Sequence, residues 1–142
     1  MFEMLILDTN HLVELDRGSA QGAALQRKLD NAGDEVATTI ISAEEQFRGW
    51  LAQIHRQRDP HEQIATYQRL QRRIEFFAAW HVLPWDTDAA NILQDLRRQR
   101  IRIGTIDSNI ASIVLAHEAT LLSGNLRDFQ QVPNLRVEDW LS

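Results

Sequence analysis

Cysteine is absent from the 142-residue chain, which excludes disulfides, zinc–thiolate sites and iron–sulfur clusters. Lysine is nearly absent as well: Lys28 is the only one, and every other basic side chain apart from histidine is arginine. The formal net charge of −5 argues against a surface that coats nucleic acid through overall positive charge. No apolar run approaches the roughly 20 residues that span a bilayer, and the N-terminal stretch has no basic segment typical of a signal peptide. We therefore expect a soluble, unprocessed, cytoplasmic protein that does not associate with a membrane.

Several motifs that carry chemistry are also missing. There is no GxGxxG or GxxxxGK[ST] loop, so the common dinucleotide and nucleoside-triphosphate sites are unsupported. The 5 histidines show no HxH or HExxH spacing, and no GxSxG elbow presents a nucleophilic serine. The carboxylates remain as the candidate chemical groups.

Short apolar segments alternate with longer amphipathic ones, without a linker or an internal repeat. Strands are expected at residues 4–7, 35–41, 81–85, 119–122 and 135–137, and helices at 11–18, 20–32, 42–59, 61–80, 86–100 and 105–117. Strands separated by helices imply right-handed crossovers between parallel strands. The sequence therefore predicts an α/β fold in a single domain over residues 1–142, with a parallel sheet of four to five strands flanked by helices on both faces.

The two central helices are expected to pack as a hairpin. The apolar face of the second one is predicted to consist of Ile64, Tyr67, Leu70, Ile74 and Phe77. The hairpin also carries four large aromatic side chains: Trp50, Phe76, Phe77 and Trp80. We expect part of this apolar surface to form the interface of a homodimer; the alternative is that these aromatic side chains fill the core of one copy.

Acidic residues follow the predicted strands, which is where the ligand crevice of a parallel sheet lies. They are Asp8 after the first strand, Glu44 and Glu45 after the second, Asp107 at the start of its helix, and Asp128 after the fourth strand. Each has an ordinary structural explanation, because an acid can cap a helix, complete a capping box with Ser42, complement a helix dipole or hold a turn. Together, however, they would converge on one edge of the sheet.

Clustered carboxylates repel one another and raise each other's pKa unless a cation lies among them. Hard oxygen ligands without histidine or cysteine suit Mg²⁺ or Mn²⁺. The sequence therefore predicts a divalent-metal site at the carboxyl edge of the sheet.

Four segments carry a resemblance to a known family: LDTNHL, SAEEQFRG, RIGTIDSNIASIVLAH and LLSGNLRDFQQVPNLRVEDW. Together they resemble a PIN domain, specifically the VapC-type toxin of a type II toxin–antitoxin pair, and they touch nearly the whole length in order. The last two segments are the most specific, whereas LDTN alone would be weak.

The resemblance implies an endoribonuclease that depends on Mg²⁺ or Mn²⁺ and cleaves RNA with a metal-activated water. Its catalytic acids map onto Asp8, Glu45, Asp107 and Asp128, with Asp8 and Asp107 as the principal metal ligands. The family's glutamate lies four residues before a glycine, which favours Glu45, with Glu44 as the alternative. Four neighbouring polar residues are expected to hydrogen-bond to the acids: Thr9, Asn10, Ser123 and Asn125.

The resemblance also implies a cognate antitoxin, a peptide of which occupies the cleft and brings an arginine or lysine toward Asp8 and Asp107. Two interpretations remain open for the arginine-rich segment of Arg97, Arg98, Arg100 and Arg102. These side chains could contact RNA, or they could form a solvated helix end. Two other functions remain open too. One is a catalytically idle PIN-like protein with an RNA-binding or regulatory role. The other is a magnesium-dependent phosphatase acting on small molecules, which would normally place a second aspartate at the position of Asn10.

Overall fold

Five parallel strands form the centre of the fold, in the order β3-β2-β1-β4-β5. The structure is a computed structural model that describes residues 3–141. The strands are β1 (Met4–Leu7), β2 (Glu35–Thr39), β3 (Val82–Leu83), β4 (Thr120–Leu122) and β5 (Arg136–Glu138). The predicted α/β fold with a parallel sheet is confirmed, and β1, the first strand in the chain, lies in the middle of the sheet between β2 and β4.

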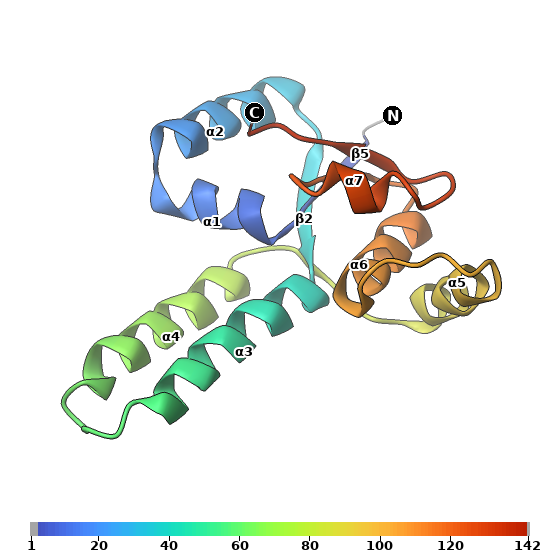
Figure 1. The fold of residues 1–142 in the computed structure, drawn as a ribbon. Helices are drawn as coiled ribbons and strands as arrows, with labels where there is room; N and C mark the ends of the chain where they lie inside the picture. Colours follow the sequence, from blue (N-terminus) through green and yellow to red (C-terminus); the bar gives the residue numbers. More distant parts are fainter. Residues whose placement is uncertain (1–2, 142) are drawn as a thin grey trace.

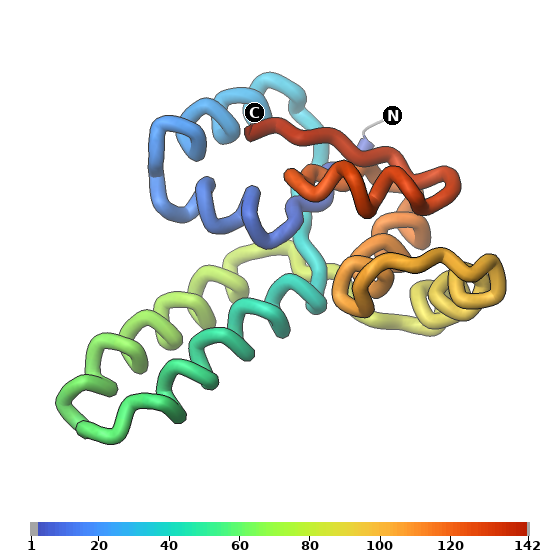
Figure 2. The backbone as a smooth tube through the Cα atoms, viewed as in Figure 1, coloured from blue at the N-terminus to red at the C-terminus, as the bar shows by residue number. Residues whose placement is uncertain are grey.

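Helices connect these strands and cover both faces of the sheet (Figures 1 and 2). They are α1 (Thr9–Arg17), α2 (Ala20–Ala32), α3 (Ile40–Arg56), α4 (Gln63–Ala78), α5 (Thr87–Arg98), α6 (Thr105–Ala116) and the short α7 (Leu126–Phe129). Within residues 3–141, no helix combines the length and the apolar character needed to cross a membrane.

The central strand β1 supplies side chains to two separate cores. Ile6 packs with buried residues of α5, α6 and α7, whereas Leu5 and Leu7 pack on the opposite face with residues of α1, α2 and α4. This division follows from strand geometry, because successive side chains point to opposite faces of a sheet. The run of apolar residues in β1 is therefore buried on both sides, as a central parallel strand requires.

Two local predictions differ from the structure. Strand β2 ends at Thr39, whose hydroxyl caps α3 by accepting a hydrogen bond of 3.1 Å from the backbone N–H of Ser42. The helix thus begins at Ile40 rather than at Ser42, and its N-cap is Thr39 rather than Ser42, which was the N-cap in the alternative explanation of Glu45 as part of a capping box. The helix α7 was not predicted, because four residues are too few to carry a helical period.

The predicted inner face of α4 is largely wrong. Ile64, Tyr67 and Ile74 are 52%, 53% and 53% exposed, while Phe77 at the sheet end of the helix is buried. The hairpin of α3 and α4 extends away from the sheet, and α4 packs chiefly against α3 (Figure 1). Spacing along a helix identifies an apolar stripe but does not say whether another element covers it.

The aromatic side chains at the inner end of the hairpin pack within the protein. Phe77 lies 5.6 Å from Phe47 and 5.3 Å from Phe76 between ring centroids, and Phe76 lies 5.5 Å from Trp80. Trp50 is half-buried, with the guanidinium of Arg69 above its ring. Phe77 therefore belongs to the core of one copy, with Phe47, Phe76 and Trp80 packed against it, whereas Trp50 and the exposed apolar residues of α4 lie outside that core.

Candidate functional site

The site begins where β1 and β4 end side by side. Asp8 follows β1 and caps α1, and its Oδ1 accepts a hydrogen bond of 2.8 Å from the backbone N–H of Thr9. Ser123 follows β4, and its buried hydroxyl donates to Oδ2 of Asp8 at 2.7 Å. Because the two strands are parallel neighbours, their carboxyl ends bring together residues that are far apart in the sequence.

The second acid comes from the first turns of α3. The hydroxyl of Thr9 donates to Oε1 of Glu45 at 2.5 Å, which ties the glutamate to the residue after Asp8. Glu44 instead accepts a hydrogen bond of 2.6 Å from Arg48 on the exposed side of α3. The structure thus directs Glu45 toward Asp8 and Glu44 toward Arg48.

The remaining two acids share a single amide. Nδ2 of Asn125 donates to Oδ2 of Asp107 at 2.9 Å and to Oδ2 of Asp128 at 3.1 Å. Asp107 lies in the first turn of α6 and Asp128 in α7. The backbone N–H of Asn125 in turn donates to the hydroxyl of Ser123 at 3.0 Å, so the two halves of the site are joined.

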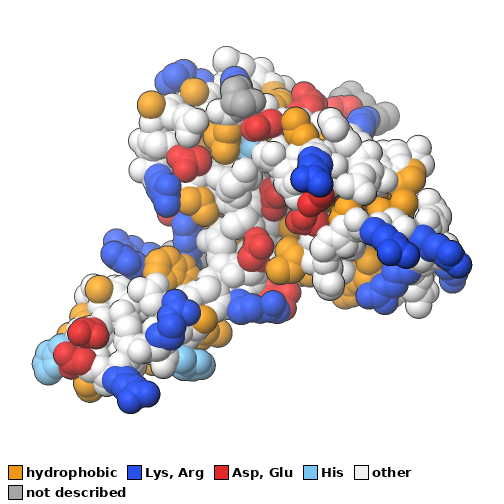
Figure 3. Space-filling model, viewed as in Figure 1, with side chains coloured by type: hydrophobic (Ala, Val, Ile, Leu, Met, Phe, Trp, Pro, Cys, Tyr) orange, Lys and Arg blue, Asp and Glu red, His pale blue; other side chains and the backbone are white. Residues whose placement is uncertain are grey.

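One open cleft is lined by Asp8, Glu45 and Asp107, together with Asn10 and Asn125. Asp128 does not line this cleft but meets it through Asn125. Figure 3 shows acidic side chains gathered at the centre of this face, while Lys and Arg side chains gather on its right-hand side over the end of α5. The arginines in that region are the exposed Arg97, Arg98, Arg100 and Arg102.

The electrostatics of the cleft disfavour negative charge. Burial raises the pKa of Asp8, opposed by its hydrogen bonds from Ser123 and Thr9 and reinforced by the charge of Glu45. Burial also raises the pKa of Asp107, and the charges of Asp8, Asp128 and Glu45 raise it further. Within residues 3–141, none of these acids forms a salt bridge with a basic side chain.

The donor atoms fit a hard divalent cation in kind, because they are carboxylate oxygens that form no salt bridge with a basic side chain of the described residues. In the described part of the chain, no three His, Asp or Glu side chains lie close enough together to enclose a metal ion. Instead, the hydroxyl and amide groups of Thr9, Ser123 and Asn125 donate hydrogen bonds to the carboxylate oxygens. Metal binding would therefore exchange some of these hydrogen bonds for coordination.

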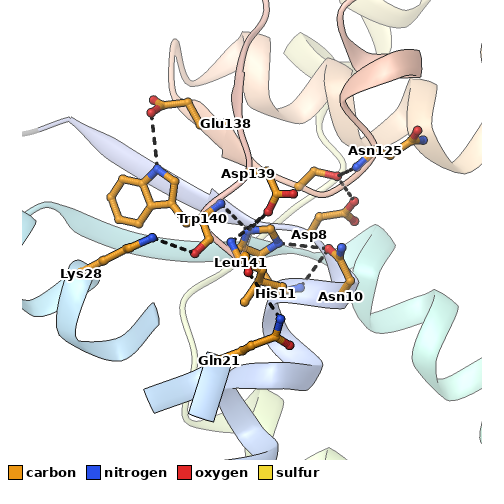
Figure 4. Close-up of polar contacts among 11 residues, drawn as sticks. Asp8, Asn10, His11, Gln21, Lys28, Asn125, Glu138, Asp139, Trp140 and Leu141 are labelled. Carbon is orange, nitrogen blue, oxygen red and sulfur yellow. Dashed lines mark hydrogen bonds and ion pairs between the residues drawn. The ribbon is translucent and has the colours of Figure 1, made fainter. Parts of the chain in front are cut away.

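Sequence reasoning missed His11, which is fully buried three residues after Asp8. Figure 4 shows its ring between Asn10 and the C-terminal segment that includes Asp139 and Trp140. Asn10, which was expected to bind an acid, instead accepts hydrogen bonds from His11. A polar residue on the buried side of α1 was the available signal, because a buried histidine needs hydrogen-bond partners.

Comparison with known proteins agrees with this architecture. The chain is 27% identical to Ribonuclease VapC1 of Rickettsia felis over 137 residues, covering 94% of this chain and 93% of that protein. Its fold is similar to a chain of the DNA-bound VapBC structure from Salmonella typhimurium, with a TM-score of 0.73, 22% identity and 99% of each chain covered. It is also similar to a chain of a toxin–antitoxin complex from Klebsiella pneumoniae, with a TM-score of 0.67, 20% identity and 96% and 97% coverage of the two chains. Residues 5–135 match the PIN domain, and with the sheet and the acids at its carboxyl edge already described, the chain belongs to the PIN-domain family.

Proposed function

We propose that this protein is an endoribonuclease dependent on Mg²⁺ or Mn²⁺ and acts as the toxin of a VapBC-type toxin–antitoxin pair. The observation that carries the proposal is the convergence of four acids, from the residue after β1 and from α3, α6 and α7, without a basic partner among residues 3–141. Acids that merely cap helices would have no reason to gather from four elements, where the charge of Glu45 raises the pKa of Asp8 and neighbouring acids raise the pKa of Asp107. An RNA substrate would place the activity in the cytoplasm.

In the proposed mechanism, Asp8 and Asp107 would hold the metal, because both line the cleft and both have a raised pKa that a cation would lower. A bound Mg²⁺ supplies Lewis-acid chemistry that activates water and stabilises the leaving oxygen of a phosphodiester. Glu45, held by Thr9, would orient the attacking water, and Asp128, which does not line the cleft, would act on the site through Asn125. Ser123 fixes the rotamer of Asp8 through its hydrogen bond to Oδ2.

Similarity to a protein named as a ribonuclease supports RNA as the substrate, and similarity to a toxin–antitoxin complex supports a cognate antitoxin. The electrostatics of the cleft indicate which kind of side chain the antitoxin would place there. Four acids that have no basic partner in the described part of the chain attract a cationic side chain, so an arginine or lysine of the antitoxin would approach Asp8 and Asp107 and take the place of the metal. Co-expression with the neighbouring reading frame, followed by purification through one partner, tests this part of the proposal. Absence of a tight partner would contradict it.

The main test is cleavage of RNA by the purified full chain in Mg²⁺ or Mn²⁺ and in EDTA. Asp8→Asn and Asp107→Asn should each abolish cleavage, while their melting temperatures without metal should equal or exceed that of the wild type, because repulsion is relieved. Mg²⁺ should raise the melting temperature of the wild type and not that of either variant, since only the wild type binds it. A folded wild type that neither cleaves RNA nor responds to Mg²⁺ would point to an idle PIN domain. Cleavage of small phosphate esters but not of RNA would point to a phosphatase.

We propose in addition that the protein is a homodimer. The supporting observation is the exposed stripe on α4 formed by Ile64, Tyr67 and Ile74, which lines a shallow groove together with Pro60 and Leu70. An isologous pairing of two α4 helices would cover each stripe with the same stripe of the second copy. A stable interface of this kind buries on the order of 2,000 Å².

Sedimentation at micromolar concentration tests the dimer. The wild type should sediment as a dimer and Ile74→Glu as a monomer, because a charge in an apolar interface is left without a partner. Glu75→Gln, next to it on an exposed position of α4, is the control and should remain dimeric. A monomeric wild type would contradict this part of the proposal without affecting the cleavage test.

A further inference from the structure

His11 lies between the C-terminal segment and the cleft, and two backbone N–H groups determine how its ring is protonated. The backbone N–H of Trp140 donates to Nε2 of His11 at 3.2 Å, so Nε2 must carry a lone pair. The backbone N–H of His11 donates to Oδ1 of Asn10 at 2.9 Å, which fixes the orientation of the Asn10 amide. Nδ1 of His11 lies 3.1 Å from the same Oδ1 and must therefore be the nitrogen that carries the hydrogen.

The surroundings keep this imidazole neutral. Burial lowers the pKa of His11, and the positive charge of Lys28 lowers it further, against the opposite effect of Asp139. Oδ1 of Asp139 lies 3.6 Å from Nε2, beyond hydrogen-bond distance, and accepts from the backbone N–H of Leu141 at 2.9 Å. Protonation of Nε2 would leave the N–H of Trp140 without its acceptor.

The C-terminal segment is itself held in place on α2. Nζ of Lys28 donates to the carbonyl of Trp140 at 3.2 Å, and Nε2 of Gln21 donates to the carbonyl of Leu141 at 3.5 Å (Figure 4). Two contacts to α2 therefore hold the backbone that directly follows the Trp140 N–H.

At the other end of this chain of contacts, the Asn10 amide faces the cleft. Its Oδ1 is used by His11, and Nδ2 forms no hydrogen bond with any of residues 3–141. Nδ2 lies against Gly124, where a Cβ atom would approach it to 2.6 Å, so the absence of a side chain at position 124 makes room for the amide. Asn10 thus contributes a free N–H donor to a cleft whose other groups are mainly acids.

We propose that His11 is a positioning residue that, through its Nδ1–H tautomer, holds Asn10 so that Nδ2 donates to a phosphate oxygen of bound RNA. This inference rests on the proposed function for its ligand. The same contacts would also be made by a histidine that only ties the C-terminus to α1, and the experiments separate these two roles.

The tautomer is tested first, by the ring ¹⁵N chemical shifts of His11 in the full chain. We expect Nδ1 to have the shift of a protonated nitrogen and Nε2 that of an unprotonated one. The reverse assignment, or a charged ring at neutral pH, would overturn the proposal. This measurement does not depend on whether the protein cleaves RNA.

The second test is the affinity for a single-stranded RNA oligonucleotide in EDTA, where a metal-dependent enzyme does not turn over. Asn10→Ala, His11→Phe and Gly124→Ala should each weaken binding roughly tenfold, because each removes or displaces one hydrogen bond to a charged acceptor. The double variant Asn10→Ala/His11→Phe should bind no more weakly than Asn10→Ala alone.

His11→Asn is the matched variant that separates positioning from stability. Its amide can still donate to Asn10 from near the position of Nδ1, but it no longer accepts from Trp140. Both His11→Phe and His11→Asn should therefore melt below the wild type, whereas only His11→Phe should lose RNA affinity. Equal affinity for RNA in the two variants, no effect of Asn10→Ala, or no binding by the wild type would overturn the proposal. Loss of cleavage alone, with these affinities as expected, would contradict only the proposed catalysis.

Discussion

The hydroxyl of Ser123 donates a hydrogen bond of 2.7 Å to Oδ2 of Asp8, joining the ends of two adjacent parallel strands. Burial raises the pKa of Asp8, and this contact acts in the opposite direction, because a hydrogen bond to a carboxylate favours its ionised form.

Replacing Ser123 with alanine should therefore raise the pKa of Asp8 further above its ordinary value. The variant should also lose about 1–3 kcal/mol of unfolding free energy, because the hydroxyl additionally accepts from the backbone N–H of Asn125. Carboxyl ¹³C shifts followed through a pH titration, together with urea unfolding, measure both effects. Ser112→Ala removes an equally buried hydroxyl that donates to Ser108 within α6, and should leave the pKa of Asp8 unchanged.

Asp107 should make stability depend on pH in a defined direction. Its pKa is raised, first by burial and then by neighbouring acids, so the folded state holds the proton more tightly than the unfolded state does. The contribution of Asp107 to the unfolding free energy consequently falls as pH rises from the ordinary value of 3.8 through the folded pKa. Metal-free Asp107→Asn should be more stable than the wild type at neutral pH, and the gain should vanish below pH 3.8.

Urea unfolding of both proteins across this pH range measures the difference directly. Asp95→Asn is the control, because Asp95 is exposed on α5 beside Arg98 and its removal should bring no gain at any pH. A constant difference between Asp107→Asn and the wild type at all pH values would contradict the expected repulsion.

The adjacent residues Glu44 and Glu45 form a matched pair for the cleavage assay. Glu45→Gln should reduce RNA cleavage by at least about a hundredfold, because it removes a charge that the proposed mechanism uses to orient water. Glu44→Gln should change cleavage less than about threefold, since Glu44 contacts Arg48 on the surface. The reverse order of effects would show that the wrong glutamate has been assigned to the cleft.

Gly22 should be intolerant of any side chain. A Cβ at this position would collide with the backbone carbonyl of Glu14, where α2 crosses α1, and backbone atoms cannot move away cheaply. Gly22→Ala should lower the unfolding free energy by about 1–3 kcal/mol. Gly49→Ala, in the exposed part of α3 with no atom within 4 Å of the added Cβ, should instead raise it by up to about 1 kcal/mol. Thermal melting of both variants provides the comparison.

Two predictions, for the inner face of α4 and for the start of α3, show where sequence patterns stop being informative. The spacing of Ile64, Tyr67 and Ile74 identified an apolar stripe, but the structure leaves all three exposed. Periodicity reports that residues share one side of a helix, whereas burial depends on which other element lies against that side. The start of α3 was misplaced for a related reason, because both Thr39 and Ser42 are good capping residues and only the end of β2 selects between them.

The sequence by itself determined the α/β fold, the approximate positions of all five strands, and the candidate acids, because alternating apolar and amphipathic segments and acids after strands are local features. Only the tertiary structure decided which residues meet. Asn125 bridges Asp107 and Asp128, Glu45 rather than Glu44 faces Thr9, and Trp140 reaches His11 across 129 positions of the chain. These contacts depend on strand order and on the path of the C-terminal segment over α1 and α2. Strand order and chain path are set by the packing of two cores around β1, which no single stretch of sequence encodes.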